Sequence, residues 1–269
     1  MSDSQEWTCG GHAGELAART WPNPDARYVA LLCHGYGEHI GRYEHVADAL
    51  VRHGAVVHGV DHIGHGRSAG ERVLIPDYEK VVDDFHGLAT HVRNPALPTV
   101  LIGHSMGGMI AARYAERYGH ELAALVLSGP VLGRWDAATG LLGLDEIPDT
   151  PIDPDTLSRD PAVGKAYADD PLVWHGRFQR ATLEAIISCL DRIRTDGPLG
   201  ALPTLWVHGA DDQLVPIDAT REGIDDLRGV VFEEKVYPGA RHEVFNETNK
   251  DEVLADVTAF VRRALGGSA

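Results

Sequence analysis

Short apolar runs alternate with amphipathic segments along most of this chain. The apolar runs have the length of buried strands, are bounded by polar residues, glycine or proline, and lie at 28–33, 55–60, 99–102, 122–127 and 203–209. A final strand is predicted at 230–237, where apolar residues flank three charged ones. Predicted helical segments, with apolar residues at helical spacing, lie at 43–52, 77–92, 108–118 and 251–265. This alternation of strands and helices predicts an α/β fold, a doubly wound and mostly parallel sheet with helices on both faces.

The alternation stops after the apolar run at 122–127. The next stretch, which begins at Gly129-Pro130 and lasts to about Gly176, is rich in proline, aspartate and glycine. We interpret 131–176 as a cap inserted into one core domain made of 1–130 and 177–269. The apolar, glycine-punctuated segment 135–144 predicts a lid that touches a lipid surface or admits an acyl chain, with a packed helix as the alternative.

The pentapeptide Gly-His-Ser-Met-Gly at 103–107 directly follows one of the predicted buried strands. It has the G-x-S-x-G form, and a helical segment comes after it. In such a strand–turn–helix context the serine occupies a strained turn, and glycines on both sides let neighbouring backbone approach. We therefore predict that Ser105 is a catalytic nucleophile.

An activated serine needs a base, and the base needs a group that holds its tautomer. The strand at 203–209 ends just before Asp211 and Asp212, so either aspartate could orient the base. The last predicted strand leads into a turn that carries His242, our predicted general base. The order serine, aspartate, histidine is that of the α/β-hydrolase fold and differs from the orders in the two unrelated serine-protease folds.

A tetrahedral oxyanion needs two backbone N–H donors, one after the serine and one from the loop after an early strand. Met106 follows the serine. The early strand at 28–33 leads into the loop His-Gly-Tyr-Gly at 34–37, where Tyr36 is placed to supply the second amide. We predict that the Tyr36 and Met106 amides form the oxyanion hole.

The size and charge of the chain limit the classes of molecule that it is expected to bind. A chain of 269 residues can bury about three-quarters of its unfolded surface as one large domain. Its formal net charge of −16 argues against binding nucleic acid and against strong attraction to anionic lipid, which favours a small, neutral substrate. We see neither a leader pattern nor about 18 consecutive apolar residues, and we expect a cytoplasmic protein. The sequence makes no prediction of oligomeric state.

Metal, phosphate and disulfide chemistry are disfavoured. His58, Asp61, His62 and His65 carry possible metal donors, but they straddle a strand end and a glycine turn and share no helical face. The glycines at 35–41 and 64–70 do not have the G-x-G-x-x-G spacing, and no Walker lysine follows. The cysteines at 9, 33 and 189 form no C-x-x-C pair and are expected to be free. We predict no metal and no cofactor.

Three motifs together resemble the monoacylglycerol lipase family of α/β-hydrolases. They are His-Gly-Tyr-Gly-Glu-His-Ile-Gly-Arg-Tyr at 34–43, Asp-His-Ile-Gly-His-Gly-Arg-Ser at 61–68 and Gly-His-Ser-Met-Gly-Gly at 103–108. Segments at 157–161, 167–172 and 237–246 are similar to that family's cap and histidine loop. The resemblance extends from about residue 14 to the C-terminal helix.

The resemblance implies an enzyme that hydrolyses monoacylglycerols to glycerol and a fatty acid through an acyl-enzyme on the serine. The family's acid falls three residues after the glycine at 209, which selects Asp212. The family also implies that Glu38, Arg42, His104 and Tyr167 lie at the alcohol end of the substrate, although Glu38 and Arg42 could equally form a structural ion pair. A carboxylesterase or lysophospholipase with the same triad, or a ligand-sensing protein on this scaffold, remains an alternative.

Overall fold

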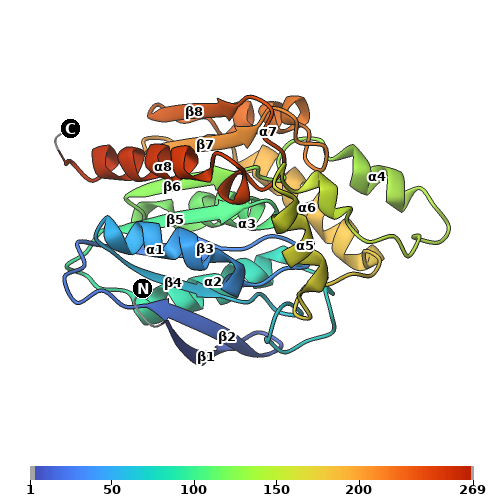
Figure 1. Ribbon diagram of the computed structural model, residues 1–269, viewed down its shortest axis with the longest axis horizontal. Helices are drawn as coiled ribbons and strands as arrows, with labels where there is room; N and C mark the ends of the chain where they lie inside the picture. Colours follow the sequence, from blue (N-terminus) through green and yellow to red (C-terminus); the bar gives the residue numbers. More distant parts are fainter. Residues whose placement is uncertain (1–3, 268–269) are drawn as a thin grey trace.

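A mostly parallel sheet forms the centre of the molecule in the computed structural model, which describes residues 4–267 (Figure 1). Within these residues the strands are ordered β1-β2-β4-β3-β5-β6-β7-β8. Strands β3 to β8 run parallel to one another, whereas β2 is antiparallel to both β1 and β4. The strands are β1 Gln5–Gly11, β2 Gly14–Trp21, β3 Tyr28–Cys33, β4 Ala55–Val60, β5 Thr99–His104, β6 Ala124–Ser128, β7 Thr204–Gly209 and β8 Phe232–Tyr237.

Two hydrophobic cores lie on opposite faces of the sheet. Successive residues of the central strands point to opposite faces, so Leu101 belongs to one core and Ile102 to the other. Helices α1 and α8 cover one face, and α2, α3, α6 and α7 cover the other (Figure 1). The helices are α1 Glu44–Arg52, α2 Tyr78–Val92, α3 Met106–Tyr118, α4 Asp136–Leu142, α5 Pro161–Asp169, α6 Arg180–Asp196, α7 Ile217–Leu227 and α8 Lys250–Ala264. The predicted doubly wound α/β fold is confirmed.

Helix α3 begins at Met106, directly after Ser105, and so two residues before Gly108, where the sequence pattern predicted its start. Close packing explains the difference. A Cβ on Gly107 would lie 2.1 Å from the Cys33 carbonyl oxygen, so only glycine lets the first turn of α3 approach the end of β3. Strands β6 and β8 each begin two residues later than predicted.

The hydrophobic pattern did not predict the antiparallel hairpin of β1 and β2, which turns between Gly11 and Gly14. Strand β1 has no fully buried residue, so it lacks the strong alternation that marks a half-buried strand. Helices α6 and α7 were not predicted individually either. The hairpin forms one edge of the sheet, far from β5 in the strand order, and so does not shape the edge at which the parallel strands end.

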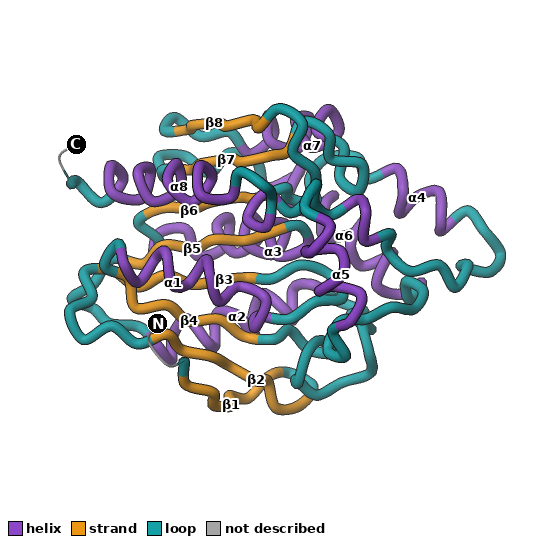
Figure 2. The backbone as a smooth tube through the Cα atoms, viewed as in Figure 1, coloured by secondary structure: helices purple, strands orange, loops and turns teal. Residues whose placement is uncertain are grey.

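The predicted cap segment, 131–176, contains α4 and α5, and both lie beyond the edge at which the parallel strands end (Figure 1). Figure 2 shows long loops gathered at the same edge. Helix α4 packs against α6 through a small apolar cluster that contains Ala138, Ile147 and Leu183. The predicted core includes residues 1–3 and 268–269, which lie outside the described part of the chain.

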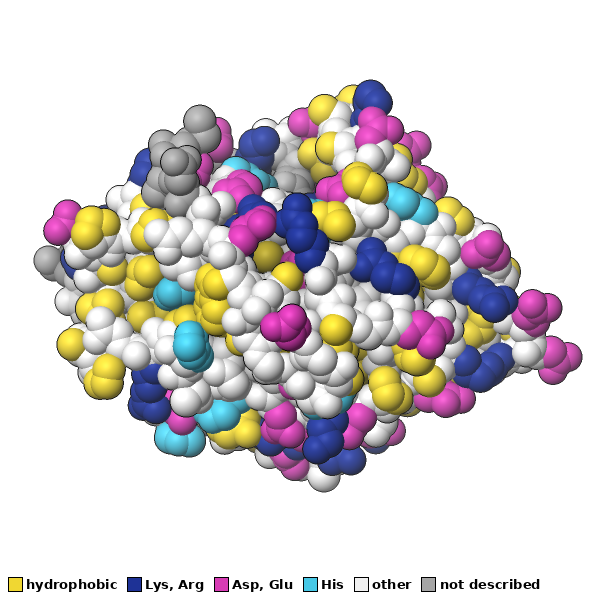
Figure 3. Space-filling view, turned by 90° about the horizontal axis from the view of Figure 1, so that it is seen from below, with side chains coloured by type: hydrophobic (Ala, Val, Ile, Leu, Met, Phe, Trp, Pro, Cys, Tyr) yellow, Lys and Arg dark blue, Asp and Glu magenta, His cyan; other side chains and the backbone are white. Residues whose placement is uncertain are grey.

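Acidic and basic side chains are intermixed on the face drawn in Figure 3, with no large area of one sign. None of the helices within 4–267 combines the length and the apolar character that crossing a bilayer requires. The three cysteines, at 9, 33 and 189, are all free, as the sequence predicts.

Candidate active site

Ser105 lies at the turn between β5 and α3 with φ 56° and ψ −121°. A non-glycine residue rarely adopts a positive φ, and such strain persists only where the surrounding structure enforces it. Here the Ser105 amide donates to the Ser128 carbonyl oxygen at 2.9 Å. A Cβ on Gly103 would lie 2.3 Å from the Gly107 carbonyl oxygen, which explains the glycines on both sides of the serine.

Ser105, His242 and Asp212 form a hydrogen-bonded triad. Nε2 of His242 lies 2.9 Å from the Ser105 hydroxyl oxygen, and its Nδ1 lies 2.7 Å from Asp212 Oδ2. All three residues are buried. Asp211, which the strand pattern left as an alternative, is exposed and belongs to the turn. The loops after β5, β7 and β8 thus bring the three predicted residues together.

The electrostatics of the pair favour a charged Asp212 and a basic His242. Burial alone would lower the pKa of His242, but the Asp212 carboxylate outweighs burial and holds this pKa above its ordinary value. Burial would likewise raise the pKa of Asp212, but His242 and His208 hold it well below its ordinary range. A histidine in this setting can take a proton from the serine and remain stable as an imidazolium.

The backbone amides of Tyr36 and Met106 are free to bind a ligand oxygen. Neither has a hydrogen-bond acceptor within residues 4–267. Met106 is the first residue of α3, where amides have no partner within the helix and the helix dipole favours negative charge. Tyr36 is in the loop after β3, beside Gly35, where an added Cβ would lie 3.2 Å from the Ser105 Cβ.

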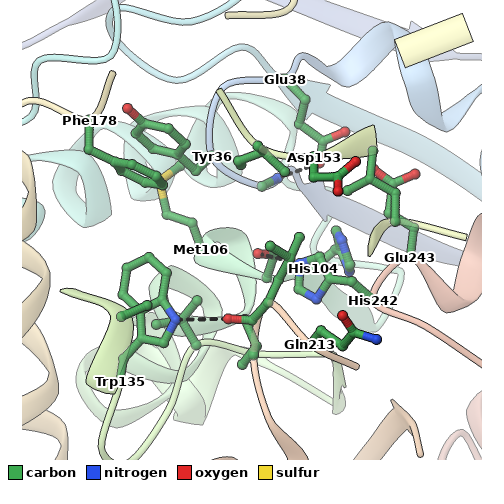
Figure 4. Close-up of a pocket in the computed structure, with 18 of the residues that line it drawn as sticks. Tyr36, Glu38, His104, Met106, Trp135, Asp153, Phe178, Gln213, His242 and Glu243 are labelled. Carbon is green, nitrogen blue, oxygen red and sulfur yellow. Dashed lines mark hydrogen bonds between the residues drawn. The ribbon is translucent and has the colours of Figure 1, made fainter. Parts of the chain in front are cut away.

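A cavity of about 240 Å³ opens beside Ser105. Figure 4 shows Glu38, Glu243 and Asp153 at one end and Trp135 and Phe178 at the other. At the apolar end, the Trp135 indole donates to the Leu214 carbonyl oxygen at 3.0 Å, and the Phe178 ring stacks on Tyr36 with centroids 4.4 Å apart. The cavity can therefore hold a molecule with one polar and one apolar end.

Arg42 bridges two buried carboxylates at the polar end. Its guanidinium donates to Glu38 at 2.5 Å and to both oxygens of Glu243 at 2.7 and 2.9 Å. Tyr43 and the Gly35 amide donate to the other Glu38 oxygen, each at 2.7 Å. Burial favours neutral acids, but Arg42 outweighs it and lowers the pKa of both glutamates. The structural ion pair that the sequence left open is therefore present, and both of its partners also line the cavity.

His104 and Tyr167 line the same end of the cavity. Burial and the nearby His242 lower the pKa of His104 to about 4, so this imidazole is neutral. The Tyr167 ring lies 5.0 Å from the Arg42 guanidinium carbon, and its buried hydroxyl has no hydrogen-bond partner within 4–267. A ligand oxygen could satisfy this hydroxyl.

Several cavity residues escaped the sequence reasoning. Glu243 stands next to His242 in the chain, and this adjacency was an available signal. Trp135 lies in the segment 135–144, which the sequence predicted to admit an acyl chain. No sequence signal marked Asp153 of the cap, Phe178 just before α6 or Gln213 in the loop after β7. Within the described residues, no group of three or more histidine, cysteine or acidic side chains is arranged to hold a metal ion.

The fold and this geometry define a serine hydrolase of the α/β-hydrolase class. The model of the family described as "Serine aminopeptidase, S33" matches residues 24–249. The chain is 41% identical to a monoacylglycerol lipase of Mycolicibacterium smegmatis, covering 89% of this chain and 90% of the relative. It is 30% identical to the human monoglyceride lipase, covering 94% and 89%.

A solved structure agrees with these relatives. The crystal structure of Paleococcus ferrophilus monoacylglycerol lipase superimposes with a TM-score of 0.80 at 25% identity, covering 93% of this chain and 99% of that one. The chain belongs to the monoacylglycerol lipase family, and the family resemblance seen in the sequence motifs is confirmed.

Proposed function

We propose that this protein hydrolyses monoacylglycerols to glycerol and a free fatty acid. The observation that carries the proposal is that the Ser105–His242–Asp212 triad lies beside a cavity that is polar at one end and apolar at the other. A monoacylglycerol has the same division, with its ester between a diol and an acyl chain. The names of the relatives support the same substrate class.

In the proposed reaction, His242 Nε2 takes the proton of the Ser105 hydroxyl as Oγ attacks the ester carbonyl. Asp212 holds the imidazole and stabilises the imidazolium. The amides of Tyr36 and Met106 donate to the oxyanion. The imidazolium then protonates the departing glycerol oxygen, and water repeats the sequence on the acyl-enzyme to release the fatty acid.

The charge at the polar end favours a neutral alcohol. Glu38, Arg42 and Glu243 together carry one net negative charge when all three are ionised, and His104 beside them is neutral. This charge would repel the phosphate of a lysophospholipid, whereas glycerol hydroxyls can donate to carboxylates and accept from the Tyr167 hydroxyl. We propose that these polar residues recognise the glycerol.

We propose that the cap, 131–176, forms the acyl end of the cavity and meets the lipid surface. Trp135, Ile152 and Leu157 of this segment line the cavity. Leu144 follows α4 and is 47% exposed, although it is a large apolar residue. An exposed leucine in the segment that also supplies cavity-lining residues is consistent with transient contact between the cap and the lipid from which the substrate comes.

The test measures fatty-acid release from monoacylglycerols of increasing chain length, with a diacylglycerol, a lysophospholipid and short p-nitrophenyl esters in parallel. We expect rapid turnover of monoacylglycerols and little of the diacylglycerol or lysophospholipid. Ser105→Ala should fold normally and lose roughly 10⁴-fold or more in kcat. The thermal unfolding of both proteins provides the control for folding.

Other outcomes would contradict the proposal in distinct ways. A preference for short simple esters would identify a carboxylesterase, and a preference for the lysophospholipid would overturn the charge argument. Turnover of Ser105→Ala comparable to that of the unchanged protein would refute the nucleophile. A protein that binds monoacylglycerol without turnover would instead be a sensor.

A further inference from the structure

His208 is a buried histidine that the proposed reaction does not use. It is the penultimate residue of β7, has no exposed surface and is not among the residues that line the cavity. Both of its ring nitrogens have close polar neighbours. Nδ1 lies 3.1 Å from the Trp206 indole nitrogen, and Nε2 lies 2.9 Å from the Val215 carbonyl oxygen and 3.3 Å from Asp212 Oδ2.

The neighbours of His208 specify its tautomer. An indole N–H can only donate, so Nδ1 of His208 must accept from Trp206 and carries no proton. The proton of the neutral ring therefore sits on Nε2, where it faces two acceptors, the Val215 carbonyl and the Asp212 carboxylate. The doubly protonated ring would direct an N–H against the indole N–H. His208 is thus held as a neutral donor.

This donor completes the surroundings of the Asp212 carboxylate. Oδ1 of Asp212 accepts from the Leu214 and Val215 amides at 3.0 and 2.9 Å, which closes the turn after β7. Oδ2 accepts from His242 and faces His208. Since His208 also binds the Val215 carbonyl, one ring ties both ends of the turn to the buried strand.

The charge of His208 affects the electrostatic attraction between Asp212 and His242. A second imidazolium beside Asp212 would reduce the attraction between this carboxylate and the protonated His242. A neutral N–H orients the Asp212 carboxylate and adds no positive charge that would compete with the His242 imidazolium. The indole of Trp206, two residues earlier on the same face of the strand, enforces this arrangement.

We propose that His208, with its tautomer set by Trp206, is a positioning residue that holds Asp212 in the orientation His242 requires. The inference rests on the proposed role of Asp212. It predicts that loss of the Nε2 donor lowers kcat and leaves KM almost unchanged, because His208 does not line the cavity.

The test compares His208→Leu, which removes the donor, with His208→Gln, which retains an amide donor. The readout is the rate at which a fluorophosphonate labels the active serine across a pH series, with kcat and KM on a monoacylglycerol in parallel. We expect His208→Leu to slow labelling roughly 10- to 100-fold, as loss of supporting partners does at metal sites. His208→Gln should stay within about threefold of the unchanged protein, since a single neutral hydrogen bond contributes little more.

The pH series separates positioning from stability. With Asp212 poorly held, burial should lower the pKa of His242, so the acid limb of labelling should move to lower pH in His208→Leu. His58→Leu serves as the matched control, because His58 is a buried strand histidine bound to Thr20 at the far side of the sheet. It should lower the thermal stability and leave the labelling rate and the acid limb unchanged.

Trp206→Phe replaces the indole with a phenyl ring and so removes the tautomer-setting donor, which preserves the test if His208→Leu does not fold. We expect labelling to slow roughly two- to tenfold. Labelling of Trp206→Phe and of folded His208→Leu at the original rate would overturn the inference, as would equal losses in His208→Gln and His208→Leu. Asp212→Ala distinguishes failure of this inference from failure of the proposed function. Undiminished labelling in that variant would refute the role of Asp212 itself.

Discussion

The two ends of the cavity are built by different kinds of interaction. At the polar end, Arg42 binds two buried carboxylates, and every carboxylate oxygen of Glu38 and Glu243 accepts at least one hydrogen bond. At the apolar end, Trp135 is held by one hydrogen bond and Phe178 by stacking. Glu38, Arg42 and Glu243 follow strands of the core, whereas the apolar walls come mainly from the cap and from Phe178 just before α6.

This difference indicates that the positions of side chains must be more exact at the polar end than at the apolar end. Hydrogen bonds and ion pairs are directional, and a buried polar group left without its partner is costly. Apolar contacts depend mainly on filled volume, so similar side chains can replace one another. We therefore expect substitutions at the polar end to impair chemistry and folding, and substitutions at the apolar end to change the preference among substrates.

The largest effect should come from Asp212→Asn. The amide can direct its N–H at His242 Nδ1 and so impose the wrong tautomer on the base, and the analogous change in a serine protease lowers kcat about 10⁴-fold. We expect a comparable loss here, measured as fatty-acid release from a monoacylglycerol. The thermal unfolding temperature should confirm that the variant is folded, and a loss below tenfold in a folded variant would contradict the assignment.

The pH profile belongs to the same prediction. Hydrolysis needs neutral His242, and Asp212 holds the pKa of His242 above 6.5. In the unchanged protein the acid limb of kcat/KM should therefore lie above pH 6.5. Without the carboxylate, burial should dominate and lower this pKa, so the residual activity of Asp212→Asn should persist to lower pH. An acid limb that stays in place would contradict this account.

Arg42→Met should chiefly affect stability. The substitution leaves Glu38 and Glu243 buried without their shared cation, which costs about 3–5 kcal/mol in the free energy of unfolding. Denaturant titration measures this change. The control is Arg67→Met, which breaks an exposed pair with Glu6 and should cost less than about 1 kcal/mol. Similar losses in the two variants would remove the distinction.

The smallest effect should come from Trp135→Ala at the apolar end. Removing the indole enlarges the cavity, so the ratio of kcat/KM for long acyl chains to that for short ones should rise by roughly tenfold. The rate on the best substrate should change little. Trp135→Phe, which retains most of the volume, is the matched control and should keep the original preference. A uniform loss on all chain lengths would place Trp135 in the chemistry instead.

Much of the fold and the central site could be predicted from local pattern. Five of the eight described strands appear as apolar runs, because strands inside a parallel sheet are buried on both faces. The edge strand β8 was also predicted, although its central residues are charged. Ser105, Asp212 and His242 could be named because each follows a recognisable strand in a known order. The β1–β2 hairpin was not predicted, since its outer strand has no fully buried residue and packs against the core only through Trp7 and Cys9.

The sequence by itself determined the alternation of strands and helices, the strained serine turn and the order of the three reactive residues. Those features depend on neighbours within a few positions along the chain. Only the tertiary structure decided which residues far apart in the chain come into contact. Arg42 binds Glu243, 201 positions away, and Trp135 binds Leu214. Such contacts depend on how loops of different strands converge at one edge of the sheet, and no local pattern encodes that convergence.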